Sequence, residues 1–395
     1  MAKQCFVHSA VLLEEALKMD GKRIEWPPIT FAETPQQRPP QKTIASGACG
    51  ENLNWTLDDS GTLTITGTGA MNNYPYGKLI PGDHKKSVKT VIIISGVTSI
   101  GNNAFNGCSN LIYVDIPSSV TSVGNDAFAW CTNLPDIDIP SSVTSIGSGA
   151  FFCCDGLTDV TIPPSVTCIE DTTFKMCSKL VRVRIPESVT SIGNRAFESC
   201  GKLSDVRIPP SVTRIGDQAF FRCGELNNVT IPDSVVSIGI GAFSHCGKLN
   251  NITYPKHITS SASYTFGGSS NLTNIEIPYG VTQIEATAFS QCYKLRSVTI
   301  PSSVVSIGYL AFSHCSGLTS VTIPEGVVSI GDEAFSCCYN LTSVSIPSSV
   351  TSIGFGAFAE CGRLSVNYCG TKADWDRIDI GYNNAPLKSA DIHCR

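Results

Sequence analysis

Eleven of the eighteen cysteines lie on one file, in which each follows the last by 23 residues or by twice that number. The members of this cysteine file are Cys108, Cys131, Cys154, Cys177, Cys200, Cys223, Cys246, Cys292, Cys315, Cys338 and Cys361. A zinc site needs four ligands around one point, whereas thiols on successive turns of chain, about 4.8 Å apart, each have at most two neighbours. Parallel side chains in register also lack the close approach that a disulfide needs, with Cβ atoms about 3.8 Å apart. The spacing therefore predicts buried free thiols that pack as small apolar residues.

Other candidate chemistry is sparse. Cys369 and Cys394 lie off the file and could pair with each other. His245 and His314 stand three repeats apart, roughly 14 Å at the strand step, so they are too distant to share a metal ion and we expect both at the surface. The sequence has no nucleophile-elbow, zinc-protease or phosphate-loop motif. It therefore favours a protein that is not an enzyme and has no cofactor and no metal site.

A strict repeat must position all of these residues. Phenylalanine recurs every 23 residues twelve times, from Phe105 to Phe358, and proline holds its own place from Pro117 to Pro347. The full unit reads LxxVxIPxSVTSIGxxAFxxCxx, as in residues 341–363. A fixed period of this length indicates a solenoid.

The unit can be interpreted as one coil of chain. Its first six residues have the alternation of a short strand, and the proline then ends the pairing because it has no N–H group to donate. Ala127, Phe128 and Cys131 fit one helical or 3₁₀ turn. We therefore expect an α/β-type but β-rich repeat solenoid of about twelve 23-residue coils, with β-rich caps at both ends.

The motifs LxxVxIP, SVTSIG and AFxxC resemble those of the BspA-like, or Treponema-type, leucine-rich repeat family, over residues 88 to about 369. Residues 54–71 and 370–393 are similar to segments that flank such arrays. The resemblance implies a cell-surface or secreted protein that binds macromolecules of a host or a neighbouring cell, and it implies no catalytic residue.

The expected domains follow from the limits of the repeat. Residues 1–42 form a flexible arm with a proline-rich linker, and residues 43–87 form a β-hairpin cap with a turn at Asp59–Gly61. The solenoid spans residues 88–369, and residues 370–395 form the second cap.

The outward-facing positions of the strands are the candidate binding site, expected on the concave side of the stack. The candidate residues are Tyr113, Asp115, Asp136, Asp138, Asp159, Arg182, Arg184, Asp205 and Arg207. The period predicts like charges side by side: Asp115 and Asp138, Asp136 and Asp159, Arg184 and Arg207. This row is either a solvated face or a patch of both charge signs that orients a large ligand, and calcium could bind at the paired aspartates.

One coil departs from the pattern. Residues 255–272 have Ser261 where the consensus has isoleucine and Ser269 where it has cysteine, yet they keep their length. An insertion would shift every later side chain off its ladder, whereas a lost side chain leaves a local gap. We therefore predict that this coil is the softest interior part of the stack.

Composition narrows the possible functions. With 28 basic and 33 acidic residues and a pI near 5.7, the chain lacks the basic character of a nucleic-acid-binding protein. No apolar run reaches the roughly 18 residues of a membrane helix, and no plain secretory signal is visible. The leading hypothesis is an adhesin-like surface or secreted module that binds a protein or glycan. The alternative is a cytoplasmic repeat scaffold or effector that mediates protein–protein interaction, favoured by the many reduced thiols.

Overall fold

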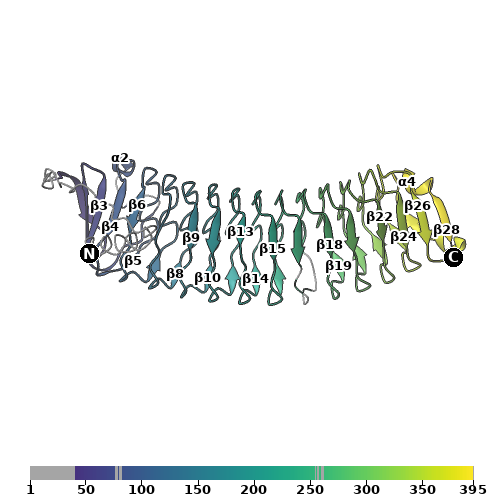
Figure 1. Cartoon of the computed structure of the whole chain (residues 1–395), viewed down its shortest axis with the longest axis horizontal. Helices are drawn as coiled ribbons and strands as arrows, with labels where there is room; N and C mark the ends of the chain where they lie inside the picture. Colours follow the sequence, from purple (N-terminus) through teal and green to yellow (C-terminus); the bar gives the residue numbers. More distant parts are fainter. Residues whose placement is uncertain are drawn as a thin grey trace, which may run out of the picture. The chain divides into compact units, whose positions relative to one another are not determined.

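The computed structural model describes residues 41–75, 79, 82–253, 255, 258 and 262–394. The predicted arm over residues 1–42 lies outside this part of the chain except for its last two residues, and so does Ser261. Residues 42–395 form one compact unit, which is a bowed solenoid (Figure 1). Its strands come from about thirteen coils. The predicted β-rich repeat solenoid is confirmed.

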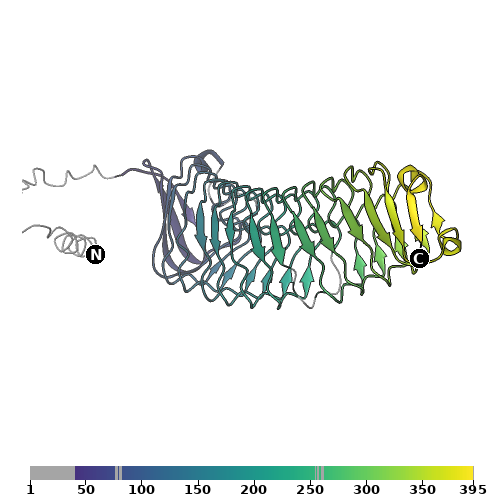
Figure 2. The ribbon, with the colours of Figure 1, turned by 45° about the vertical axis from the view of Figure 1, so that its right-hand side comes forward.

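Two rows of short parallel strands run along the solenoid, one strand of each row from most coils (Figures 1 and 2). The first row comprises β4 (Thr90–Ile93), β6 (Tyr113–Asp115), β9 (Asp159–Thr161), β11 (Arg182–Arg184), β13 (Asp205–Val206), β15 (Asn228–Thr230), β17 (Asn251–Thr253), β18 (Asn274–Glu276), β20 (Ser297–Thr299), β22 (Ser320–Thr322), β24 (Ser343–Ile346), β26 (Ser365–Tyr368) and β28 (Asp391–Cys394). The second row comprises β5 (Val97–Ile100), β7 (Ser122–Val123), β8 (Ser145–Ile146), β10 (Cys168–Ile169), β12 (Ser191–Ile192), β14 (Arg214–Ile215), β16 (Ser237–Ile238), β19 (Gln283–Ile284), β21 (Ser306–Ile307), β23 (Ser329–Ile330), β25 (Ser352–Ile353) and β27 (Asp379–Ile380). In the repeat region most pairs have a register of 23 residues, as between Val160 and Val183.

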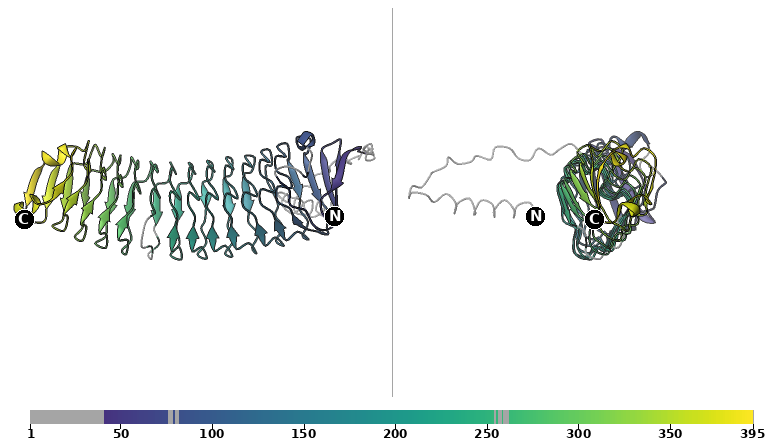
Figure 3. Two further views of the ribbon diagram at one scale, coloured as in Figure 1. Left: turned by 180° about the vertical axis from the view of Figure 1, so that it is seen from behind. Right: turned by 90° about the vertical axis from the view of Figure 1, so that its right-hand side faces the viewer.

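The core is a set of stacked ladders. The twelve repeat phenylalanines are fully buried, and each ring stacks on the next with centroids 5.2–5.9 Å apart. The view along the solenoid axis shows the coils superimposed on one another (right panel of Figure 3). The predicted column of phenylalanines is therefore present, and each coil buries its apolar residues against its neighbours.

The third side of each coil is a turn rather than the predicted helical or 3₁₀ turn. Two residues per coil have positive φ, for example Arg195 (φ 56°) and Ser199 (φ 61°). A helix would use its N–H groups within its own turn. Here the N–H groups of Arg195, Phe197 and Ser199 all donate to carbonyl oxygens of the next coil, at 2.7–2.8 Å. The N–H groups of Glu198 and Cys200 bond within the turn, to the carbonyl oxygens of Arg195 and Phe197 at 3.2 and 3.1 Å. The helical interpretation was wrong because only alternate N–H groups bond locally and the others bond between coils.

Pro135 interrupts the first row. At the same position of neighbouring coils, the N–H groups of Ile112 and Val181 donate to the coil before, at 2.8 Å. Proline has no N–H group, and residues 134–140 form no strand.

Both ends of the solenoid are covered. At the N-terminal end, β1 (Thr43–Ala48), β2 (Asn52–Asp58) and β3 (Thr62–Ala70) form an antiparallel sheet. β3 then pairs in parallel with β4 and β5, so the cap continues both strand rows. The short helix α2 (Gly82–Lys85) precedes β4.

At the C-terminal end, α3 (Lys372–Trp375) and α4 (Ala385–Lys388) flank β27, and β28 pairs with β26. Trp375 and Ile378 are buried and Ile380 is half-buried. The Trp375 ring meets Tyr368 edge-on with centroids 5.2 Å apart. These side chains cover the last core layer. Within the described part of the chain, no helix is long and apolar enough to cross a membrane.

Candidate functional site

The strand face consists of the outward side chains of the first strand row, and its charged part lies on β9, β11 and β13. Arg182 on the middle strand is directly opposite Asp159 on one side and Asp205 on the other. Its guanidinium group pairs with Asp159 at 3.3 Å and with Asp205 at 3.1 Å. The two carboxylates thus hold one arginine from both sides, on a face that stays exposed to solvent.

The other two arginines extend this patch, although not as the period predicted. Arg184 donates to the Asp159 carboxylate at 2.8 Å and to the Thr161 hydroxyl at 3.2 Å. Arg207 instead pairs with Glu187 at 2.6 Å, a residue in the loop after β11. The prediction placed Arg184 and Arg207 side by side, but each guanidinium group turns to its own carboxylate because opposite charges attract and like charges repel.

Sequence reasoning missed these ion pairs, although part of the signal was available. Asp159, Arg182 and Asp205 are separated by 23 residues each, so the period alone places them on adjacent strands. Glu187 could not be found in this way because it lies 20 residues from its arginine. We call the six charged residues Asp159, Arg182, Arg184, Glu187, Asp205 and Arg207 the charged patch.

The remaining candidates lie toward the N-terminal end. Tyr113 and Asp115 are exposed on β6. Asp136 and Asp138 are also exposed, but they lie where Pro135 interrupts the first row, in a coil that has no first-row strand. Strand register therefore does not hold these two aspartates beside Asp115 or Asp159.

A calcium site at the paired aspartates finds no support in this geometry. The carboxylate of Asp159, one of the paired aspartates, already forms ion pairs with Arg182 and Arg184. Among the residues that the structure describes, no group of three or more His, Cys, Asp or Glu side chains could hold a metal ion.

The cysteine file lies in the core, as predicted. The ten thiols from Cys131 to Cys361 each donate to a phenylalanine carbonyl of the preceding coil, for example Cys200 Sγ to the oxygen of Phe174 at 3.1 Å. Burial raises the pKa of these thiols above the ordinary value of 9.0, to about 12 at Cys246. A thiol must ionise to be a nucleophile or a metal ligand, so these groups are suited to packing rather than to chemistry. Cys369 and Cys394 are both free.

The variant coil over residues 255–272 retains this bond. The hydroxyl of Ser269 is fully buried and donates to the Phe243 carbonyl at 2.9 Å, so serine replaces the thiol without leaving the carbonyl unpaired. The predicted softness of this coil stays a prediction.

Through Tyr264 this coil also joins an aromatic cluster with His245 and Phe221 of the two preceding coils, which the sequence did not reveal. His245 Nε2 lies 2.7 Å from the hydroxyl of Tyr264, and its ring meets Phe221 edge-on. Burial and the nearby Arg222 lower the pKa of His245. A Cβ on Gly268 would lie 2.4 Å from the imidazole ring. The coil therefore has glycine where the large rings need room, and His245 is half-buried rather than fully at the surface.

Comparison with known proteins identifies the repeat. The family model described as "BspA type Leucine rich repeat region (6 copies)" matches residues 83–204, 190–316 and 282–374. Together these matches cover residues 83–374, about three quarters of the chain. A search of functionally curated proteins finds no match.

Several solved structures are similar to this chain. A leucine-rich repeat protein from Bacteroides ovatus is 27% identical with a TM-score of 0.66, over 87% of this chain and 98% of its own. One from Eubacterium ventriosum is 27% identical with a TM-score of 0.50, over 80% and 95% of the two chains. A leucine-rich cell surface protein from Faecalibacterium prausnitzii is 28% identical with a TM-score of 0.49, over 86% and 98%. The continuous match to the repeat model, together with the observed solenoid, shows that the chain belongs to the BspA-type leucine-rich repeat family.

Proposed function

We propose that this protein is a non-enzymatic recognition module that binds a protein or glycan partner through its strand face, with the charged patch as the centre of contact. The observation that carries the proposal is the arrangement of Arg182 between Asp159 and Asp205. Ion pairs of this kind hold long side chains in fixed positions, which lowers the entropy lost on binding. Arginine is also enriched in protein interfaces.

The chemistry of the patch favours a partner that itself carries both charge signs. Its three arginines alternate with three carboxylates, so no large field of one sign is present to attract a polyanion. Complementary charges of both signs give specificity and orientation more than raw affinity. The exposed side chains of Arg184 (55%) and Arg207 (70%) can exchange part of their internal pairing for contacts with a partner.

The proposed location is the cell surface or the outside of the cell, which is what membership of the BspA-type family implies. Adhesion is the role that follows from a long binding face at this location. The file of free thiols is the observation that favours the alternative, a cytoplasmic scaffold, because reduced cysteines are typical of the cytoplasm. Detection of the chain on intact cells or in culture supernatant supports the surface proposal, and confinement to the cytoplasm would exclude it.

Binding to immobilised extracellular-matrix proteins tests the site. We expect the full chain to bind, and we expect the double variant Arg184→Glu/Arg207→Glu to bind about tenfold more weakly, since each reversal puts a repulsive charge at the interface. The matched control is Lys179→Glu/Lys202→Glu, which reverses two exposed charges off the strand face. If both double variants bind with equal affinity, the charged patch has no role in binding.

A further inference from the structure

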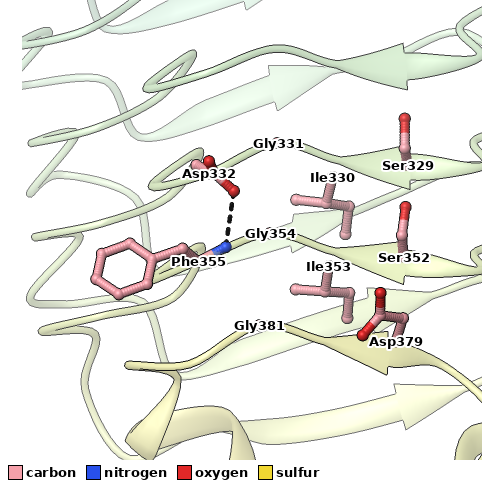
Figure 4. Close-up of a pocket in the computed structure, with 10 residues that line it drawn as sticks. All are labelled: Ser329, Ile330, Gly331, Asp332, Ser352, Ile353, Gly354, Phe355, Asp379 and Gly381. Atoms are coloured by element: carbon pink, nitrogen blue, oxygen red, sulfur yellow. Dashed lines mark hydrogen bonds between the residues drawn. The ribbon is translucent and has the colours of Figure 1, made fainter.

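A second surface, distinct from the charged patch, lies over β23, β25 and β27 near the C-terminal end. Here a shallow groove of about 400 Å³ runs across successive coils (Figure 4). Its floor contains Gly331, Gly354 and Gly381, which lack side chains because the coils approach closely there. A Cβ on Gly354 would lie 2.5 Å from a backbone nitrogen of the coil before.

One side of the groove is aromatic. Phe355 points away from the strands along this side (Figure 4) and is 47% exposed. Backbone hydrogen bonds between coils show that Tyr309, Asp332, Phe355 and Tyr382 hold the same place in four successive coils. Tyr309 and Tyr382 therefore continue the file of exposed rings beyond the groove, and Asp332 stands between Tyr309 and Phe355. Tyr309 and Tyr382 are 50% and 84% exposed. Large rings left open to water in one file are typical of binding surfaces.

Carboxylates and hydroxyls supply the polar part of the groove. Asp332 Oδ1 accepts a hydrogen bond from the backbone N–H of Phe355 at 2.8 Å (Figure 4). Within the described residues, Asp332 Oδ2 and the Asp379 carboxylate have no hydrogen-bond donor. Ser329 and Ser352 lie on the same side as Asp379. The groove therefore presents free acceptor oxygens next to exposed rings.

Most of the surrounding sequence has no cation. Residues 297–362 contain no lysine or arginine, and their acidic residues are Glu325, Asp332, Glu333 and Glu360. Near Asp379, the side chains of Lys372 and Arg377 are paired with Asp376 and Asp374. A phosphorylated or sulfated ligand would meet repulsion here. A neutral ligand rich in hydroxyl groups fits, because hydroxyls donate strong hydrogen bonds to carboxylates and the apolar face of a sugar ring packs on an aromatic ring.

We propose that this groove binds a neutral polysaccharide laid along the solenoid axis. Along the axis a linear polymer meets Asp332, Phe355 and Tyr382 in successive coils, and beside them Ser329, Ser352 and Asp379. Weak contacts to single sugars can therefore add up through linked binding. The groove shares no residue with the charged patch, so the test of the groove is independent of the test of the charged patch.

Titration of the full chain with laminarin, mannan and dextran tests the proposal, with heparin and poly-L-lysine as polyanion and polycation. We expect binding to at least one neutral polysaccharide. Phe355→Ala should weaken it about five- to tenfold through loss of ring packing. Asp332→Asn should also weaken it while keeping the fold, since Asn125 Oδ1 accepts the equivalent backbone N–H bond from Ser148.

Tyr339→Ala is the matched control, because Tyr339 is 55% exposed but does not line the groove. Far-UV ellipticity shows whether each variant is folded. The proposal is overturned if none of the neutral polysaccharides binds, if poly-L-lysine is the ligand that binds, or if Phe355→Ala and Tyr339→Ala have equal effects.

Discussion

Alkaline pH should unfold this protein steeply, because the cysteine file cannot ionise in the core. Burial is the main cause that raises the pKa of every thiol in the file above its ordinary value of 9.0. The pKa reaches about 12 at Cys108 and Cys246. In the unfolded chain the same thiols ionise near pH 9.

The sign and size of the effect follow from proton linkage. A raised folded-state pKa contributes stability that is fully present below pH 9 and is lost as the pH rises from there toward the raised folded-state pKa. Within this window each thiol costs about 1.4 kcal/mol of unfolding free energy per pH unit. Eleven thiols together cost roughly 15 kcal/mol at pH 10, which is as large as the whole stability of a typical domain, about 5–15 kcal/mol.

Urea unfolding followed by ellipticity between pH 8 and pH 10 measures this effect, since its slope against pH gives the number of protons released. In the control variant, serine replaces Cys177, Cys200 and Cys223. Serine is the native residue at position 269, where its hydroxyl donates the same kind of hydrogen bond to a phenylalanine carbonyl. At the pH 10 end of this range the slope should fall by nearly three protons, since each unfolded thiol is then about nine-tenths ionised. A stability that stays flat up to pH 10, or a slope that the triple variant leaves unchanged, would refute the reasoning.

Three further predictions concern the ladders. Phe220 stacks on two rings and Phe358 on one, so Phe220→Leu should cost about 0.5–1.5 kcal/mol more than Phe358→Leu in urea unfolding, the value of one aromatic pair; equal costs would contradict this. A Cβ on Gly216 would lie 2.6 Å from a backbone nitrogen of the preceding coil, whereas one on Gly201 meets nothing within 4 Å. Gly216→Ala should therefore lower the unfolding free energy by about 1–3 kcal/mol, with Gly201→Ala nearly neutral. Pro135→Thr adds an N–H donor to the interrupted strand row and should stabilise the chain by about 0.5–1.5 kcal/mol; an unchanged urea midpoint would show that the missing donor is not the cause of the interruption.

The sequence predicted the ladders because one residue type fills each buried position. Phenylalanine and cysteine recur at a fixed step, because a position that is buried against the next coil accepts few residue types. The turns were misassigned for the opposite reason. Their left-handed positions hold residues as different as Arg195, Thr172 and Leu310, so their composition gives no signal of a shared conformation.

The candidate site was predicted in part. The period gives the neighbours of Arg182, since backbone register fixes which residues lie opposite one another. It does not give the direction of a long side chain, which depends on the nearest opposite charge. Arg184 turns back to Asp159, and Arg207 reaches Glu187 in a loop that the period does not relate to it.

Photo-cross-linking from the strand face tests the central claim most directly. A photoreactive side chain replaces Thr230, which is exposed on β15 beside the charged patch, and in a control chain replaces Met176, which is exposed in a turn. With matrix proteins as partner, we predict a cross-link from position 230 that disappears when Arg184→Glu and Arg207→Glu are added, and little from position 176. Equal cross-linking from both positions, or a cross-link at 230 that persists after the two reversals, would contradict the account.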